Sequence, residues 1–151
     1  MEQDKMLIER IVSEINVEVD SLLKLKEEHQ QFIEKYSLID RYLLRAKASI
    51  LADFYIGVER VFEIIGEEIN GGIPKGEYWH KRLLREMSIE IEEIRPPVIS
   101  EGLYNNLLKF LGFRHVIRQA YGFQLDEQKL KELDSIFEKT LDLFVKEIKI
   151  F

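Results

Sequence analysis

Apolar residues recur at helical spacing along most of the chain, and this pattern predicts helices. From Asp4 to about Lys35 they follow the spacing of one helix face, with Glu and Lys between them. Neither glycine nor proline interrupts this segment, so we expect one long amphipathic helix. Its apolar positions are Ile8, Ile11, Val12, Ile15, Val19 and Leu22.

A second helix is predicted after a short break around residues 37–40, and its apolar face is wide. The main row alternates steps of four and three residues: Leu44, Ala48, Leu51, Tyr55, Val58, Phe62, Ile65 and Ile69. Further apolar residues lie beside this row: Ala52, Phe54, Val61 and Ile64. So wide a face does not suit a two-stranded coiled coil and favours the central helix of a bundle, which we call the hub helix.

Loop signals divide the next part of the chain into shorter segments. The run NGGIPKGE, Asn70 to Glu77, holds three glycines and a proline and predicts a loop. A shorter helix restarts at Trp79 and is expected to end at the Arg-Pro-Pro sequence of residues 95–97. Ser100 is a candidate N-cap of the following helix, which we expect Gly122 to stop.

Asp126 is a candidate N-cap of the last helix, which carries one more apolar stripe. The stripe consists of Leu130, Leu133, Phe137, Leu141, Phe144 and Ile148. Strand-like alternation, internal repeats and linker composition are missing from the sequence. We therefore predict an all-α fold, an up-and-down four-helix bundle with one additional shorter helix, in a single domain spanning residues 1–151.

Composition narrows the classes of protein that this bundle can belong to. The chain has 151 residues, 46% of them hydrophobic, which suffices for one compact domain. Its formal charge of -6 disfavours nucleic-acid binding by the molecule as a whole, so any such contact must be local. Cysteine is absent, the first residues do not resemble a signal peptide, and no apolar run is long enough for a membrane span. We expect a cytoplasmic protein without a membrane partner.

Helical bundles can hold metals, but the histidines of this chain do not follow a metal-binding pattern. A ferritin-like di-metal site needs two Glu-x-x-His pairs and two further glutamates. Here one pair is present, Glu77 with His80, and His29 has Lys26 where the glutamate would stand. We expect neither a metal nor a cofactor, and interpret His80, beside Trp79, as a helix-start or packing residue.

The segment FRHVIRQAYG, Phe113 to Gly122, concentrates cations and ring nitrogens in an otherwise acidic chain. From Leu103 to Leu125 there is no aspartate or glutamate, where about four would be expected from the composition. Lys109, Arg114 and Arg118 are therefore predicted to form an uncompensated positive strip. Arginine presents a fork of donors that matches phosphate oxygens, so the strip is a candidate phosphate-binding surface.

Helical geometry predicts how the side chains of this segment are grouped. At 100° per residue, Arg114, Arg118 and Tyr121 form one polar ridge, and His115 and Gln119 share an adjacent face. The ridge is a candidate surface for binding the phosphate groups of RNA or a nucleotide. It also suits a solvated helix face, arginines paired with acids of a neighbouring helix, or a docking surface for an acidic partner.

The hub helix carries three charged residues that its wide apolar face does not explain: Asp53, Glu59 and Arg60. They are either ordinary surface charges or partners of the arginine ridge across a groove. The sequence leaves both interpretations open.

Four stretches of the chain, in order, resemble the HepT-like branch of the HEPN superfamily, whose members are small helical bundles. The family signature is an arginine, four to six intervening residues and a histidine, often followed by x-Tyr, and FRHVIRQAYG stands where this motif would be. The other stretches are LLRAKASILADFYIGVERVFEIIGEEI (43–69), YWHKRLLREM (78–87) and RPPVIS (95–100). The stretches extend from residue 43 to residue 122, and the resemblance covers most of the chain.

The resemblance implies a metal-independent ribonuclease site in which Arg114 stabilises charge on the phosphate. The motif histidine, which would handle a proton of the attacking 2′-hydroxyl, is replaced by Gln119. An amide does not titrate near neutral pH, and losing acid–base catalysis costs a factor of about 10² to 10⁴ in rate. His115, one turn before Gln119 on nearly the same face, is an alternative source of the imidazole.

The resemblance also implies partners. HepT-like proteins are toxins of toxin–antitoxin pairs whose antitoxin is a minimal nucleotidyltransferase, and the motif tyrosine, here Tyr121, accepts nucleotidyl groups in some of them. Such a modification would place negative charge in the groove meant for RNA. A homodimer is expected by resemblance and from the surplus of apolar surface on the hub helix. A non-catalytic module that binds a nucleotide, RNA or the nucleotidyltransferase is the alternative function.

Overall fold

A computed structural model describes residues 2–36, 40–119, 121 and 125–151. This part of the chain forms five helices and contains no β-strand; its only ladder pairing is an isolated bridge between Ile91 and Arg95. The helices are α1 (Glu2–Lys35), α2 (Arg41–Glu68), α3 (Trp79–Met87), α4 (Glu101–Gln119) and α5 (Glu127–Ile150). The predicted all-α fold, with four long helices and one shorter helix, is confirmed.

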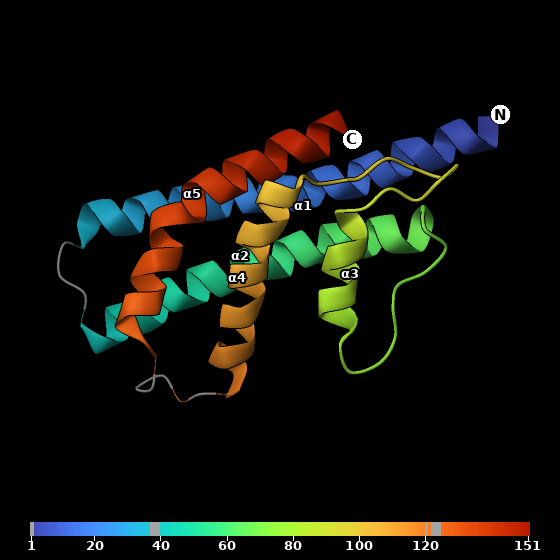
Figure 1. The fold of residues 1–151 in the computed structure, drawn as a ribbon. Helices are drawn as coiled ribbons and strands as arrows, with labels where there is room; N and C mark the ends of the chain where they lie inside the picture. Colours follow the sequence, from blue (N-terminus) through green and yellow to red (C-terminus); the bar gives the residue numbers. More distant parts are fainter. Residues whose placement is uncertain (1, 37–39, 120, 122–124) are drawn as a thin grey trace.

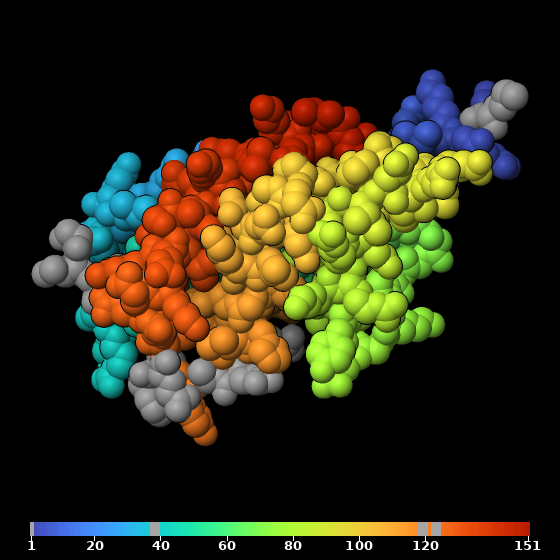
Figure 2. Space-filling view, in the orientation of Figure 1, coloured from blue at the N-terminus to red at the C-terminus, as the bar shows by residue number. Residues whose placement is uncertain are grey.

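The hub helix of the sequence pattern is α2, and it packs against each of the other four helices. In Figure 1, α1 and α2 lie side by side and run in opposite directions, while α4 crosses α2. Gly57 of α2 marks a very close approach to α1, because a Cβ atom built there would lie 2.5 Å from Cδ2 of Leu22. Figure 2 shows α3, α4 and α5 next to one another on the outer surface.

Aromatic side chains join the hub helix to the two helices that follow the long loop. Phe54 of α2 makes edge-to-face contacts with Phe110 of α4 and Phe137 of α5, at centroid distances of 5.0 and 5.3 Å. Phe62 contacts Phe144 of α5 in the same way at 5.8 Å. These rings are fully buried, and such pairs add about 0.5–1.5 kcal/mol each to the burial of their apolar surface.

Side-chain caps begin the helices where the sequence predicts them. The Asp126 carboxylate accepts hydrogen bonds from the backbone N–H groups of Gln128 and Lys129, and the Ser100 hydroxyl accepts one from Leu103 N–H at 3.2 Å. Both predicted N-caps are confirmed. The expected stop at Gly122 lies outside the described residues.

The end of α3 differs from the prediction. The helix ends at Met87 rather than at the Arg-Pro-Pro sequence. Residues 88–100 instead form an irregular segment in which the buried Arg95 side chain donates to the carbonyl groups of Glu86, Ile89 and Pro96. The Glu86 carbonyl group also accepts from the Ile89 N–H at 3.3 Å, so the Arg95 side chain adds a charged donor at the end of the helix and binds two carbonyl groups of the irregular segment.

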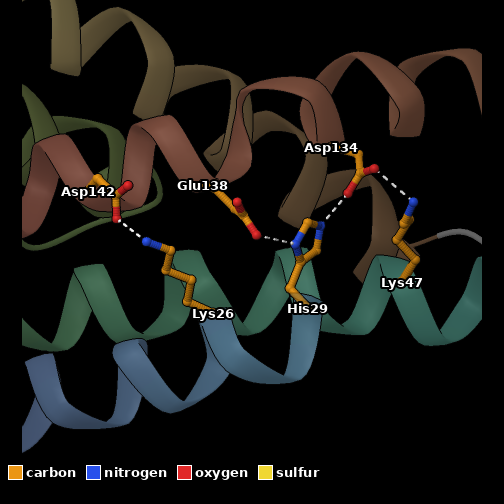
Figure 3. Close-up of polar contacts among 6 residues, drawn as sticks. All are labelled: Lys26, His29, Lys47, Asp134, Glu138 and Asp142. Atoms are coloured by element: carbon orange, nitrogen blue, oxygen red, sulfur yellow. Dashed lines mark hydrogen bonds and ion pairs between the residues drawn. The ribbon is translucent and has the colours of Figure 1, made fainter. Parts of the chain in front are cut away.

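A buried polar network fastens α1 to α5. Figure 3 shows the His29 ring of α1 between two carboxylates of α5, with Nε2 2.5 Å from Asp134 Oδ1 and Nδ1 3.2 Å from Glu138 Oε1. Lys47 of α2 donates to the other Asp134 oxygen at 2.7 Å. A carboxylate only accepts, so both ring nitrogens donate when the imidazole is doubly protonated. His29 is thus a structural residue of the bundle.

Among the described residues, no helix combines the length and the apolar character needed to cross a bilayer.

Candidate functional site

The buried carboxylate of Glu59 on α2 holds residues from two other helices. Its Oε1 atom lies 3.3 Å from Nη1 of Arg114 on α4, and its Oε2 atom lies 2.7 Å from Nδ1 of His80 on α3. We call these three residues the Glu59 cluster. Residues far apart in the sequence thus meet at one point of the bundle.

Packing of the surrounding apolar residues fixes this geometry. Glu59 follows Val58, a fully buried residue of the hub helix, and its own side chain is only 6% exposed. The short helix α3 is anchored by its buried residues Leu83, Leu84 and Met87, which place its first turn against α2. Buried Phe110 and Phe113 anchor the part of α4 that carries Arg114.

Charge pairing explains why a carboxylate is tolerated at this depth. A buried carboxylate is strongly destabilising unless it is paired and hydrogen-bonded, and Glu59 has a partner at each oxygen. The negative charge of Glu59 also affects the pKa values of neighbouring ionisable groups. Burial first, and then the charge of Glu59, raise the pKa of the Glu63 carboxyl and of the Tyr55 hydroxyl.

Two buried polar atoms near the cluster have no hydrogen-bond partner among the described residues: Nε of Arg114 and the hydroxyl of Tyr55. Each unsatisfied group of this kind costs about 1–3 kcal/mol. Arg114 is therefore paired but not saturated. Its side chain is 15% exposed, so part of it reaches the surface.

His80 has a second role that the sequence pattern does not reveal. It lies in the first turn of α3 and stacks on the Trp79 ring at a centroid distance of 3.7 Å, which agrees with a helix-start and packing residue. In addition, its Nδ1 is bound to Glu59 while 29% of its side chain is exposed. The only sequence signal for this pairing was a charged residue within the apolar face of the hub helix.

The structure changes the interpretation of the acid-free segment. Arg114 is not part of an uncompensated strip, because α2 supplies the acid that α4 lacks. Of the two interpretations of the hub charges, Glu59 is a partner of the arginine, whereas Asp53 and Arg60 are exposed surface residues.

Of the other predicted site residues on α4, Lys109 and His115 do not join the Glu59 cluster. Lys109 is exposed and lines a different cleft, described below. His115 is exposed and lies about 100° around the helix from Arg114, which points toward α2. The backbones of Arg118 and Gln119 form the end of α4, and their side chains lie outside the described part of the structure.

Tyr121 lies beyond the end of α4. The helical projection that placed it on one ridge with Arg114 is therefore wrong for this residue, because that projection needs a continuous helix through Tyr121. Its side chain is 71% exposed.

A cleft of about 670 Å³ lies between α4 and α5, on a different face of α4 from Arg114. Its lining is mostly apolar, with Phe113, Val116 and Leu133 among the residues. Its charged residues are Lys109, Asp126, Lys129 and Glu132. Neither this cleft nor the second one, beside Pro96 and Phe151, includes Arg114.

In the ranges that the structure describes, no group of three or more His, Asp or Glu side chains is arranged to hold a metal ion.

Comparison with known protein families identifies the family of this chain. The family model described as HepT-like protein matches residues 46–151, from the second turn of α2 to the end of the chain, and thus includes all three residues of the Glu59 cluster. The helix α1 precedes the matched region. No significant match was found among curated proteins or among solved structures.

Proposed function

Because the chain belongs to the HepT-like protein family, we propose that it is the toxin component of a toxin–antitoxin module and cleaves RNA without a metal ion. The observation that supports this proposal is the Glu59 cluster. There, Arg114, the motif arginine, is held by a buried carboxylate whose other oxygen binds the His80 imidazole. Such a set of groups can act on a phosphodiester through charge and proton transfer alone.

Arg114 would stabilise the charge that develops on the phosphate. A guanidinium in a largely buried position acts more strongly on an anion than one in bulk water, because the surrounding dielectric is lower. Glu59 restricts the arginine to one orientation, so less freedom is lost when the substrate binds. The same pairing lowers the net positive charge of the site.

The partners in this proposal are an RNA substrate, a second copy of the chain and a minimal nucleotidyltransferase as the antitoxin. The exposed position of Tyr121 beyond α4 supports it as the acceptor of a nucleotidyl group, because its ring is accessible to another enzyme. Negative charge added there would repel the RNA backbone.

A non-catalytic module that binds RNA, a nucleotide or the nucleotidyltransferase is the second candidate function. Two observations favour it. Gln119 stands at the motif histidine position, and Glu59 already occupies one face of the Arg114 guanidinium. Both features weaken catalysis by the family motif more than they weaken binding.

The test is an RNA cleavage assay in the presence of EDTA, with a fluorescein-labelled single-stranded RNA of mixed sequence. We expect the natural protein to cleave and Arg114→Ala to lose about 10²-fold or more in rate. Arg45→Ala is the matched control, since Arg45 is an exposed arginine of α2 about 21 Å along that helix from Glu59. Cleavage that appears only in Gln119→His would contradict the enzyme and support the binding module.

A further inference from the structure

We propose that His80 is the catalytic base of this site and that Glu59 is its positioning residue. The inference rests on the function proposed above and names the group that performs the proton transfer. Gln119 cannot do so, and His115 is turned about 100° away from the Arg114 direction on the same helix.

Hydrogen bonding to Glu59 determines which nitrogen of His80 can act as a base. Nδ1 lies 2.7 Å from Oε2 of Glu59, and a carboxylate only accepts, so Nδ1 carries a proton. In the neutral ring the lone pair is then on Nε2, on the other side of the imidazole. A carboxylate that binds one nitrogen of a histidine and leaves the other for the substrate is the arrangement that orients a general base.

Burial of the two residues fits this division of roles. The Glu59 side chain is 6% exposed and therefore shielded from solvent, whereas the His80 side chain is 29% exposed and accessible to a substrate. Stacking on Trp79 restricts rotation of the imidazole. The base is thus held in one orientation with one edge at the surface.

Arg114 and His80 are neighbours because they bind the two oxygens of one carboxylate. A phosphodiester that contacts the guanidinium would therefore place its ribose near the imidazole. The charged groups around His80 include Glu59 and Glu63 of α2, and Arg114 of α4 shares the Glu59 carboxylate with it. Tyr55 lies near the same carboxylate, and its burial raises the pKa of its hydroxyl.

The proposed reaction is a transesterification within the RNA. Nε2 of His80 takes the proton of the ribose 2′-hydroxyl, and the 2′ oxygen forms a bond to the adjacent phosphorus while Arg114 stabilises the extra negative charge. The bond between phosphorus and the 5′ oxygen breaks, and that oxygen takes a proton from water. His80 returns its proton to the hydroxide that remains. The products are a 2′,3′-cyclic phosphate and a free 5′-hydroxyl.

The experiment measures the rate of cleavage of the same labelled RNA, with EDTA, across a range of pH. We expect His80→Gln and His80→Ala to lower kcat by about 10² to 10⁴. Binding of an uncleavable RNA with a 2′-deoxy position should change little, because the base acts on the reaction and not on affinity. The acidic limb of the pH–rate profile should disappear in both variants, and added imidazole should restore part of the activity of His80→Ala.

Glu59→Gln tests the positioning role, and Glu77→Gln is its matched control. Glu77 is an exposed glutamate three residues before His80 and has the same charge. Glu59→Gln should lower kcat, because the amide no longer fixes which nitrogen of the His80 ring carries the proton or how the ring is oriented. Glu77→Gln should leave the rate and the profile as in the natural protein. Thermal unfolding of each variant identifies any loss of fold.

The outcomes separate the two proposals. Cleavage by the natural protein that persists within threefold in both His80 variants, or keeps its acidic limb in them, would overturn the role of His80 and leave the ribonuclease function standing. No cleavage by the natural protein, when binding of the uncleavable RNA is intact, would overturn the ribonuclease function and the base together. Products ending in a 3′-phosphate formed directly, without a cyclic intermediate, would also overturn the inference.

Discussion

Arg114 of α4 donates a hydrogen bond to Glu59 of α2 across 3.3 Å, so the arginine of the acid-free segment is paired with an acid from another helix. The pairing links the hub helix to the acid-free segment of α4. It also makes Glu59 the residue on which the positions of both Arg114 and His80 depend.

Replacing Glu59 by alanine should destabilise the fold. The substitution leaves the Arg114 guanidinium, which already has one unsatisfied nitrogen, without its ion-pair partner in a site that is 85% buried for that side chain. We expect the free energy of unfolding to fall by about 2–3 kcal/mol, the cost of losing hydrogen bonds to charged groups. Urea denaturation monitored by circular dichroism measures this change.

Glu67→Ala is the control for that prediction, because Glu67 is an exposed glutamate two turns further along the same helix. Its effect should stay within about 0.5 kcal/mol. Equal effects of the two substitutions would show that the Glu59 cluster contributes nothing specific to stability.

Asp134 should make the stability of the bundle sensitive to acid. Burial opposes ionisation of this carboxyl, but hydrogen bonds from His29 and Lys47 outweigh it and hold its pKa below the usual range. Its folded pKa is thus lower than the unfolded value of about 3.9. The stabilisation is present above about pH 4 and is lost as the pH falls through the folded pKa. Urea denaturation between about pH 2 and pH 7 should show this decline.

Asp134→Asn should lower stability near neutral pH and flatten the decline in acid, because the asparagine no longer titrates. Asp142→Asn is the matched control on the same helix: Asp142 also binds a lysine, Lys26, but its side chain is 56% exposed. An exposed ion pair contributes about 0–1 kcal/mol, so the control should keep the acid dependence of the natural protein. Parallel curves for the natural protein and Asp134→Asn would contradict the prediction.

Most of the fold could be predicted from the sequence because apolar periodicity and N-caps are local signals. The row of apolar residues from Leu44 to Ile69 predicts a helix buried on a wide face, and α2 has that face. The end of α3 was predicted wrongly because a proline shows where a helix cannot continue and not where it stops. The helix ends earlier, at Met87, where the Arg95 side chain adds a hydrogen bond to the carbonyl group of Glu86.

The candidate site was harder to predict, because its members come from three helices. Sequence spacing places Arg114 and His115 on one helix but contains no information about which helix faces them. The sequence pattern shows Glu59 only as a charge that the apolar face of the hub helix does not explain. Its contacts with Arg114 and His80 depend on how α3 and α4 pack on α2. Pairing across helices is a tertiary property, so a residue such as His80 acquires its role only in the folded bundle.

Tyr121 should be the residue that a partner nucleotidyltransferase modifies. The residue is 71% exposed, and we expect co-expression with a nucleotidyltransferase encoded beside the gene to add nucleotidyl mass to the natural protein and none to Tyr121→Phe. Tyr42→Phe is the matched control, because Tyr42 is 70% exposed on α2 and should leave the mass gain unchanged. Intact-mass spectrometry and fragment mapping measure the gain and its position. The modified protein should also bind RNA more weakly, since phosphate groups repel the RNA backbone. A mass gain that survives in Tyr121→Phe would show that another residue accepts the group.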